Sequence, residues 1–471
     1  MMGLLDRAGA RLTNNPEDAE ILVVNTCSFI DSAKQESVNT ILEMVQHKTA
    51  GTAKRLIVAG CLVERYRDEI QKNIPEVDAV VGTGELEAIL EAAGLTMAAP
   101  AVSASPFNIL TASELVERAP SAVHTHSRPE GTLREEQGRF SREHWDGAIA
   151  SLPNYLYTDE TPRILTTPKS SAYIKIAEGC DHPCGFCIIP QLRGKFRSRR
   201  FESVVAEAEN LVRQGVREIT LIGQDTTCYG EDFGMKDGLA QLLEALAGIP
   251  GLKWLRFLYA YPNKVTTRLL ETIARHDNIA KYLDVPLQHA APNVLKRMKR
   301  GGSGEIFLKM LDKARSIVPD LVVRTTFIVG FPGETEEDFR LLEEFVEKAQ
   351  IDWLGAFPYS DEEGSAAFDL DLKVAKRAIE SRRKRLMKLQ QKISAQKQAA
   401  WVGKEMDLLV EGVSDETELL WQGRTMLHAP EIDGKVLIND FGPHDTLVPG
   451  TFYRCEIVES HHYDVVARIV E

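Results

Sequence analysis

Three cysteines stand within eight residues of one another near the middle of the chain. Cys180, Cys184 and Cys187 lie in the segment Gly-Cys-Asp-His-Pro-Cys-Gly-Phe-Cys, directly after an apolar run that predicts a strand. Thiolates at this spacing can bind three irons of a [4Fe–4S] cluster and leave the fourth iron without a protein ligand. An open iron of this kind can chelate the amino and carboxylate groups of S-adenosylmethionine (SAM). A structural zinc site with His182 as fourth ligand is the alternative, but the paired C-x2-C spacing typical of zinc is missing.

Two further cysteines follow predicted buried strands in the first part of the chain. Cys27 comes after the run Ile21-Leu-Val-Val-Asn25, and Cys61 comes after Arg55-Leu-Ile-Val-Ala59. Neighbouring parallel strands end at the same edge of a sheet, which is where open α/β sheets bind ligands. We therefore treat Cys27 and Cys61 as candidate metal ligands. Two buried, inert thiols are the alternative.

The other two cysteines, Cys228 and Cys455, have no partner at a readable spacing, and a structural role is favoured for both. Seven cysteines is an odd number, spread over a long chain without a signal peptide, so a disulfide framework is not expected. No apolar run is long enough for a transmembrane helix. The sequence predicts a soluble, cytoplasmic protein without a membrane partner.

The elements that must position these cysteines fall into four segments. Residues 1–97 predict a small α/β domain with a parallel sheet, and residues 98–168 an insertion or linker, partly helical near 112–118. Residues 169–400 alternate six strand-like runs with helices, which indicates a partial (β/α) barrel that ends in a long helix. Residues 401–471 predict a small β-barrel, because short strands are separated by turn signals such as Asp433-Gly434.

Charge is distributed unevenly between these segments. The chain has a formal charge of −13, which argues against non-specific coating of nucleic acid. Residues 373–400 hold ten Lys or Arg and one acid; such a run usually forms a solvated or domain-bridging face, and contact with RNA is the alternative. Residues 401–471 hold 14 acidic and 5 basic residues, so their net charge is 5 − 14 = −9. An acidic surface would attract a basic protein.

The segment from Glu178 through Cys187, continuing Ile-Ile-Pro-Gln-Leu-Arg-Gly194, resembles the core of the radical SAM methylthiotransferases. The C-terminal segment resembles their TRAM domain. Within the family, Ile188-Ile-Pro, Gly223-Gln-Asp-Thr-Thr, Asp284-Val-Pro-Leu-Gln-His289 and Ala429-Pro-Glu-Ile-Asp-Gly434 are similar to the branch that modifies an aspartate of ribosomal protein S-twelve. The alternative branch modifies a tRNA adenosine.

The resemblance implies a transferase with SAM and two [4Fe–4S] clusters as cofactors. The barrel cluster, on Cys180, Cys184 and Cys187, would generate a 5′-deoxyadenosyl radical, and a second cluster, in the N-terminal domain with Cys27 and Cys61 as ligands, would supply sulfur. The expected partners are the S-twelve protein, either free or on the ribosome, and a flavodoxin- or ferredoxin-like electron donor, and we expect a monomer. Family members normally begin with a strand and a Gly-Cys loop that provides a first cluster ligand. This sequence opens at Met1-Met-Gly-Leu-Leu, inside the following helix, so that ligand is expected to be missing.

Polar groups at the strand ends are expected to orient SAM. Gln224 and Asp225 follow the second barrel strand and are placed to meet its aminoacyl end, whereas Gln288 and His289 would face the ribose. Gly330 and Gly333 would let the backbone approach the adenine. Each is alternatively a turn residue or a satisfied core polar group. The basic residues that follow the cluster predict either a solvated face or partners for a carboxylate: Arg193, Lys195, Arg197, Arg199 and Arg200.

Overall fold

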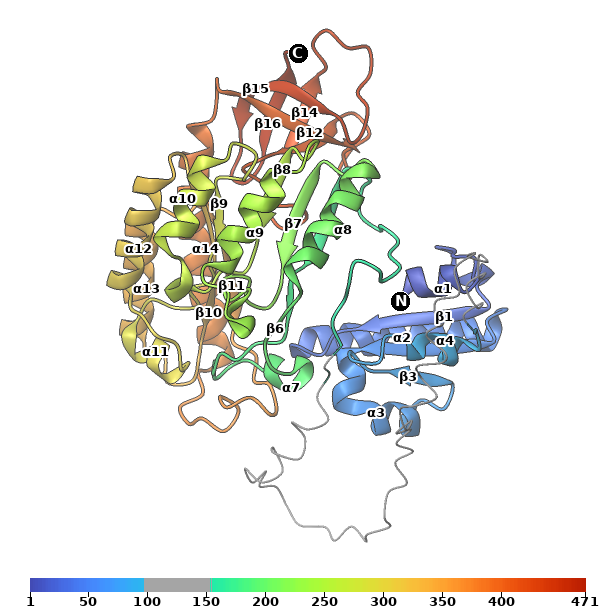
Figure 1. Cartoon of the computed structure of the whole chain (residues 1–471). Helices are drawn as coiled ribbons and strands as arrows, with labels where there is room; N and C mark the ends of the chain where they lie inside the picture. Colours follow the sequence, from blue (N-terminus) through green and yellow to red (C-terminus); the bar gives the residue numbers. More distant parts are fainter. Residues whose placement is uncertain (97–152, 154) are drawn as a thin grey trace.

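The computed structural model describes residues 1–96, 153 and 155–471. The predicted helix at 112–118 and most of the predicted linker lie outside these residues. Three bodies follow one another: a three-stranded N-terminal sheet, six central parallel strands covered by helices, and a closed C-terminal barrel. In Figure 1 the C-terminal barrel lies at one end of the central strands, and the N-terminal sheet lies beside the other end. Within the described part of the chain, no helix combines the length and apolar character that crossing a membrane requires.

The N-terminal sheet is parallel, with the order β1 (Ile21–Thr26), β2 (Arg55–Gly60) and β3 (Ala79–Val81). Leu56 and Val58 of β2 face α2 (Asp31–Ala50) and α3 (Cys61–Asn73), whereas Ile57 and Ala59 face α1 (Met2–Arg7) and α4 (Ala88–Ala93). Helices on both faces explain why β2 is a continuous apolar run. The short 3-10 helix η1 (Pro16–Asp18) precedes β1.

The central strands form two parallel sheets that meet along one seam. The first sheet has the order β4 (Ser171–Lys175), β7 (Glu218–Ile222), β8 (Trp254–Phe257), and the second has β9 (Tyr282–Asp284), β10 (Val322–Val329), β11 (Trp353–Pro358). Leu255 of β8 pairs with Ile279, just before β9. The result is an open partial barrel in which every strand presents its carboxyl end at the same side. The predicted fold class, with a parallel N-terminal sheet, a partial (β/α) barrel and a small C-terminal barrel, is confirmed.

Helices cover the outside of the central strands because each carries one apolar face. In α13, for example, Phe339, Leu342 and Val346 are fully buried, and Thr335 and Asp338 form a capping box at its start. The covering helices are α8 (Phe201–Arg213), α9 (Gly238–Ala247), α10 (Thr267–Arg275), α12 (Gly304–Ile317), α13 (Glu336–Ala349) and α14 (Lys376–Ala399). Shorter elements are β5 (Ala177–Glu178), α7 (Ile189–Arg193), β6 (Arg197–Ser198), η2 (Glu231–Phe233), η3 (Pro262–Lys264) and α11 (Pro292–Arg297).

The basic helix α14 joins the central strands to the C-terminal barrel. Its apolar side buries Ile379, Leu386 and Ile393 in the main core. Near its end, Lys397 pairs with Asp352 at 3.0 Å, and Gln398 donates a hydrogen bond to the Tyr463 carbonyl of the C-terminal barrel. The helix therefore bridges two domains, as the sequence interpretation of its basic run favoured.

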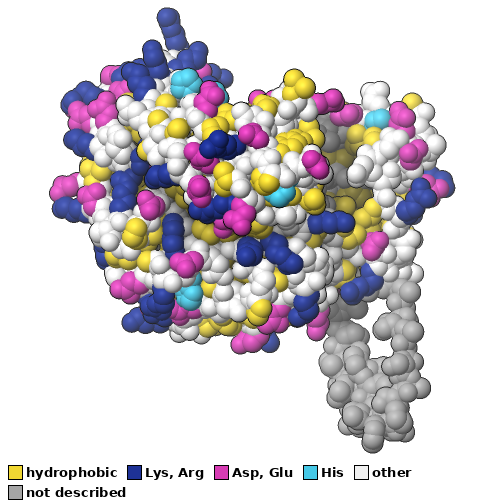
Figure 2. All heavy atoms as spheres, turned by 90° about the horizontal axis from the view of Figure 1, so that it is seen from above, with side chains coloured by type: hydrophobic (Ala, Val, Ile, Leu, Met, Phe, Trp, Pro, Cys, Tyr) yellow, Lys and Arg dark blue, Asp and Glu magenta, His cyan; other side chains and the backbone are white. Residues whose placement is uncertain are grey.

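The C-terminal barrel closes the amino end of the central strands. It consists of β12 (Glu405–Val413), β13 (Trp421–Thr425), β14 (Val436–Asp440), β15 (Phe452–Ser460) and β16 (Val465–Ile469), closed in the order β12-β13-β14-β16-β15. Glu218, the first residue of β7, pairs with Arg424 of β13 at 2.7 Å and with Arg256 of β8 at 3.5 Å, and all three side chains are buried. Figure 2 looks onto this end, where acidic and basic side chains are interspersed. The carboxyl end of the strands is left for chemistry.

Candidate functional site

The cysteine segment lies at the carboxyl end of the central strands, between β5 and α7. Gly179 precedes the first cysteine with φ +79°, and a Cβ added there would stand 2.2 Å from the carbonyl oxygen of Lys195. A glycine is therefore required where the segment begins. In the middle of the segment, the Gly185 N–H donates to the Met298 carbonyl at 2.8 Å. Backbone contacts thus fix the loop independently of its thiols.

The three thiols of this loop are chemically suited to a cluster rather than to a single ion. Burial raises the pKa of Cys180 to about 11 and that of Cys187 to about 12, and the neighbouring thiols, Cys184 included, add to both shifts. A metal must therefore displace their protons. Within residues 1–96, 153 and 155–471, one group alone brings three potential ligand atoms within 4.8 Å of one another, and it does not contain these cysteines. Tetrahedral zinc needs converging ligands, whereas a cluster gives each thiolate its own iron.

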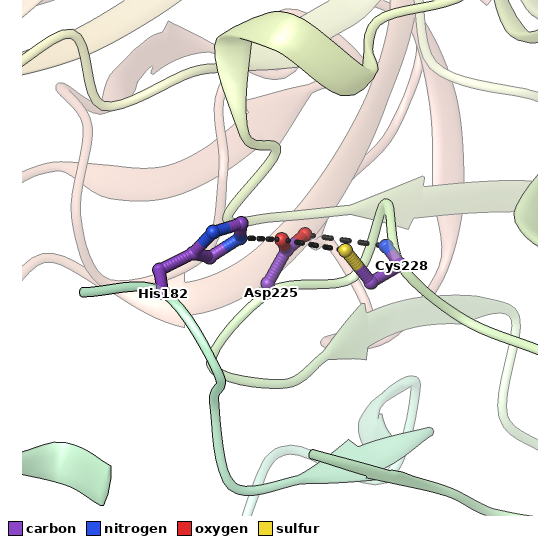
Figure 3. Close-up of side chains that lie close together, drawn as sticks. All are labelled: His182, Asp225 and Cys228. Carbon is purple, nitrogen blue, oxygen red and sulfur yellow. Dashed lines mark hydrogen bonds and ion pairs between the residues drawn. The ribbon is translucent and has the colours of Figure 1, made fainter. Parts of the chain in front are cut away.

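His182 pairs with Asp225, which lies in the loop after β7 (Figure 3). Its Nε2 lies 2.6 Å from Asp225 Oδ2, which also accepts a hydrogen bond from the Cys228 thiol at 3.1 Å. Asp225 Oδ1 accepts from the backbone N–H of Thr227 at 2.8 Å. Burial alone would raise the pKa of Asp225, but these donors hold it below its usual range. The carboxylate expected to contact SAM thus has protein partners on both oxygens, and the His182 ring is paired with this carboxylate.

A column of side chains runs from His182, in the middle of the cysteine loop, through Tyr261 and Arg300 to the sulfur of Cys184. The His182 ring stacks on Tyr261 with centroids 3.7 Å apart and planes 9° from parallel. The Arg300 guanidinium lies over the Tyr261 ring, 4.5 Å from its centroid. Arg300 Nη1 in turn lies 3.4 Å from the sulfur of Cys184. Tyr261 and Arg300 belong to no recognisable motif, so sequence reasoning missed them.

The two N-terminal cysteines leave the same edge of their sheet. Thr26 of β1 and Gly60 of β2, the residues before Cys27 and Cys61, are paired in the parallel register. Burial raises the pKa of Cys61, and the nearby Cys27 thiol contributes to the shift. Cys27 itself is exposed. A second pair of thiols is therefore available on the N-terminal body.

Helix α7 follows the cysteine loop and packs against α3 of the N-terminal body. Ile188 and Leu192 pack with Cys61 in a small buried cluster. Arg193, the last residue of α7, donates to the sulfur of Cys61 at 3.3 Å and to Glu178 at 3.1 Å. Burial alone would raise the pKa of Glu178, but Lys175 and Arg193 hold it below its usual range. The two groups of cysteines therefore lie at opposite ends of one short helix.

The polar residues predicted to orient SAM lie around the same end of the barrel. Gln224 Oε1 is buried and has no hydrogen-bond partner among the described residues. His289 is fully buried; its Nδ1 accepts from the Ala291 N–H at 3.0 Å, and its Nε2 lies 3.6 Å from the buried Glu334 carboxylate, without a hydrogen bond among the described residues. Gln288 adopts a left-handed φ of +71° and pairs with β10. Buried polar atoms without partners are rare and mark places where a ligand can supply the missing bond.

The two glycines predicted to approach the adenine have a reason within the protein. A Cβ on Gly330 would stand 2.3 Å from the Ile379 side chain, and one on Gly333 would stand 2.5 Å from the Arg297 guanidinium. Both glycines also have positive φ angles. The chain's own packing is therefore sufficient to require glycine at both positions.

The basic residues after the cysteine loop divide between internal partners and solvent. Arg193 and Arg199 pair with Glu178 and Glu207, and Arg199 is almost fully buried. Lys195 and Arg200 are exposed. The predicted choice between a solvated face and carboxylate partners thus has a different answer for each residue, and the carboxylates are the protein's own.

Known families match each of the three bodies. Residues 1–82 match a family described as uncharacterized protein family UPF0004, residues 174–346 match the radical SAM superfamily, and residues 402–470 match the TRAM domain. Together with the cysteine loop at the carboxyl end of a partial barrel, these matches define a radical SAM enzyme, whose superfamily uses a [4Fe–4S] cluster and SAM.

Similar proteins extend over the whole chain. The protein named ribosomal protein uS12 methylthiotransferase RimO from Koribacter versatilis is 67% identical over 470 residues, which are 100% of this chain and 93% of that protein. The proteins of the same name from Solibacter usitatus and Myxococcus xanthus are 53% and 43% identical, over 100% of this chain and 91% and 88% of those proteins. The chain belongs to the RimO family of radical SAM methylthiotransferases. The branch expected from its motifs is confirmed.

Solved structures are more distant. The radical S-adenosylmethionine methyltransferase TsrM from Kitasatospora setae, with cobalamin and a [4Fe–4S] cluster bound, is 16% identical; the match covers 75% of this chain and 63% of that one, with a TM-score of 0.47. Coproporphyrinogen III oxidase HemN from Escherichia coli is 14% identical, covering 61% and 70%, with a TM-score of 0.39. Neither likeness bears on the chemistry of this chain.

Proposed function

We propose that this protein adds a methylthio group to the β-carbon of an aspartate in ribosomal protein uS12. The names of its relatives support this substrate. The structural observation that carries the proposal is the junction at α7, where Arg193 contacts Cys61 while the same short helix follows directly on Cys187. A methylthiotransferase must bring a sulfur source to a carbon radical, and the two cysteine groups lie close to one junction.

The barrel loop is the proposed site of radical formation. Cys180, Cys184 and Cys187 would hold a [4Fe–4S] cluster and leave one iron for SAM. When bound, the cluster supplies the electron that cleaves SAM into methionine and the 5′-deoxyadenosyl radical that removes a substrate hydrogen. The protein's own contribution is to fix the thiols through Gly179 and Gly185 and to keep this end of the barrel shaped around its reactants.

The residues proposed to orient SAM follow the central strands at their carboxyl end. Gln224 Oε1, a buried acceptor without a partner among the described residues, would accept a hydrogen bond from the SAM amino group. Gln288 and His289 would face the ribose, with Glu334 3.6 Å from His289 Nε2. Gly330 and Gly333 would border the adenine. Asp225 would meet the aminoacyl end of SAM together with Gln224, and His182 and the Thr227 N–H would hold its carboxylate in place.

The N-terminal body is the proposed sulfur donor. Cys27 and Cys61 would be ligands of a second [4Fe–4S] cluster, with a flavodoxin- or ferredoxin-like protein as electron source and the monomer as the working unit. The proposed domains are 1–97 for this body, 98–168 for a linker, 169–400 for the barrel with its helix, and 401–471 for the TRAM domain.

The direct test is anaerobic co-expression of this chain with uS12, followed by mass spectrometry of the uS12 peptides and of tRNA nucleosides. The expected result is a methylthio group on one aspartate. Unmodified uS12 together with methylthiolated tRNA adenosine would assign the chain to the other branch and overturn the proposal.

Two matched variants separate chemistry from expression. Cys184→Ala is expected to abolish the modification, because the barrel cluster loses a ligand. Cys455→Ala, which removes a buried thiol of the C-terminal barrel far along the chain from both cysteine groups, is expected to keep it. Loss of modification in both variants would point to a general folding defect.

A further inference from the structure

Arg300 is held against the sulfur of a proposed cluster ligand by three separate contacts. Its Nη1 lies 3.4 Å from Cys184 Sγ, and its Nη2 donates to the Pro286 carbonyl at 2.8 Å. Its guanidinium plane covers the ring of Tyr261 at 4.5 Å. A planar guanidinium with a stacked face and a bonded edge has little rotational freedom. The charge therefore stays beside the sulfur.

The ring beneath Arg300 is itself fixed. Tyr261 stacks on His182 with nearly parallel planes, and His182 pairs with the buried Asp225 at 2.6 Å. The column thus runs from the end of β7, through the middle of the cysteine loop, to the sulfur of Cys184. Its members come from four different segments of the chain, so the arrangement depends on the tertiary fold.

A cation that donates a hydrogen bond to a ligand sulfur stabilises the more negative state of an iron–sulfur cluster, because reduction adds one negative charge. We propose that Arg300 raises the reduction potential of the barrel cluster, and that Tyr261 is the positioning residue that holds Arg300 on Cys184. The inference rests on the proposed function in one respect, namely that the loop binds a cluster. It identifies two residues as tuning the electron-transfer step.

The test is a redox titration of the anaerobically reconstituted full chain. The electron paramagnetic resonance signal of the reduced cluster is the readout. Cys27→Ala/Cys61→Ala is the common background, so that the barrel cluster alone is observed. Arg300→Met is expected to lower the ratio of reduced to oxidised cluster at a fixed potential by about tenfold, which corresponds to about 59 mV for a one-electron couple. Arg300→Lys keeps the positive charge but lacks the planar guanidinium. Its reduction potential is expected to lie between those of the background protein and Arg300→Met. Tyr261→Leu is expected to shift the potential in the same direction as Arg300→Met.

Arg275→Met is the matched control, because it removes an exposed arginine of α10 that pairs with Glu244. Its potential is expected to equal that of the background protein. An unchanged potential in Arg300→Met, at a full iron content, overturns the inference. If Arg300→Met fails to load iron, Arg300→Lys and Tyr261→Leu decide, and unchanged potentials in both also overturn it. Failure of the unmutated chain to bind any cluster would instead reject the proposed function.

Discussion

The guanidinium of Arg193 lies 3.3 Å from the sulfur of Cys61, although 132 residues separate them in the sequence. Its other terminal nitrogen lies 3.1 Å from Glu178, at the start of the cysteine loop. One side chain therefore contacts both the N-terminal sheet and the barrel. This contact gives the first of four predictions.

Replacing Arg193 with Met is expected to destabilise the protein by about 2 kcal/mol, because the buried Glu178 loses one of its two cations. The loss is expected at the junction of the two bodies. Thermal unfolding, together with limited proteolysis that releases the N-terminal body, measures it. The double variant Arg193→Met/Glu178→Gln is expected to recover part of the stability, since no unpaired carboxylate remains buried. A double variant whose loss equals the sum of the two single losses would contradict the coupling.

Acid is expected to destabilise the chain through His428. Burial, together with the nearby Arg424 and Arg256, lowers the pKa of His428 from 6.5 to about 3. The unfolded chain therefore binds a proton below pH 6.5 that the folded chain refuses, and stability falls as the pH falls from 6.5 towards 3. Between pH 7 and pH 5 this residue alone costs about 2 kcal/mol.

The check is to compare the pH dependence of unfolding in wild type and His428→Leu. The variant carries its own packing defect, so the two curves are expected to differ in height at pH 7. Below pH 6.5 they are expected to converge, because only the wild-type chain takes up a proton at this ring on unfolding, which stabilises its unfolded state. Parallel curves down to pH 5 would exclude His428 as an acid-sensitive group.

The junction with the C-terminal barrel depends on the buried pair Arg424 and Glu218. Removing one partner of such a pair strands the other charge and costs about 3–5 kcal/mol. Arg424→Met is therefore expected to lower the unfolding temperature sharply and to expose the C-terminal barrel to proteases. Arg454→Met removes an arginine from the surface of the same barrel, where its side chain is 40% exposed, and is expected to cost less than about 1 kcal/mol. Equal effects of the two substitutions would contradict this account.

Gly179→Ala is expected to prevent iron from binding at the barrel loop, since the new Cβ meets a backbone oxygen at 2.2 Å. Iron and sulfide per chain after reconstitution measure the effect. The control is Gly215→Ala, which has φ +106° but nothing within 4 Å of the added Cβ. It is expected to cost about 1–2 kcal/mol through backbone strain alone and to keep its iron. A normal iron content in Gly179→Ala would contradict this prediction, because the cysteine loop would then bind iron with the backbone at residue 179 displaced.

Local patterns were sufficient to predict much of this fold. Apolar runs such as Arg55-Leu-Ile-Val-Ala59 predict buried parallel strands because both faces of the sheet are covered, and β2 follows that run closely. The spacing of Cys180, Cys184 and Cys187 predicts the loop because a cluster needs ligands close together. The strand ends likewise predict that Cys27 and Cys61 share an edge.

The contacts between distant segments were not predictable in this way. Nothing in the sequence near Tyr261 or Arg300 indicates that they lie together beside Cys184, since the contact arises only when three distant segments of the chain meet. The same holds for Arg193 and Cys61. Gly330 shows a second limit of sequence reasoning. A glycine in the sequence does not reveal whether a ligand or a side chain occupies the space beside it, and here that space holds the Ile379 side chain.

Helix α7 has five residues, so it spans only about 7.5 Å along its axis. Its first residue lies two positions after Cys187, and its last residue, Arg193, contacts Cys61 at the start of α3, so that little chain separates the two contacts. Any hinge motion of the N-terminal body must consequently pull on the cysteine loop. The short helix thus limits how far the two groups of thiols can move apart.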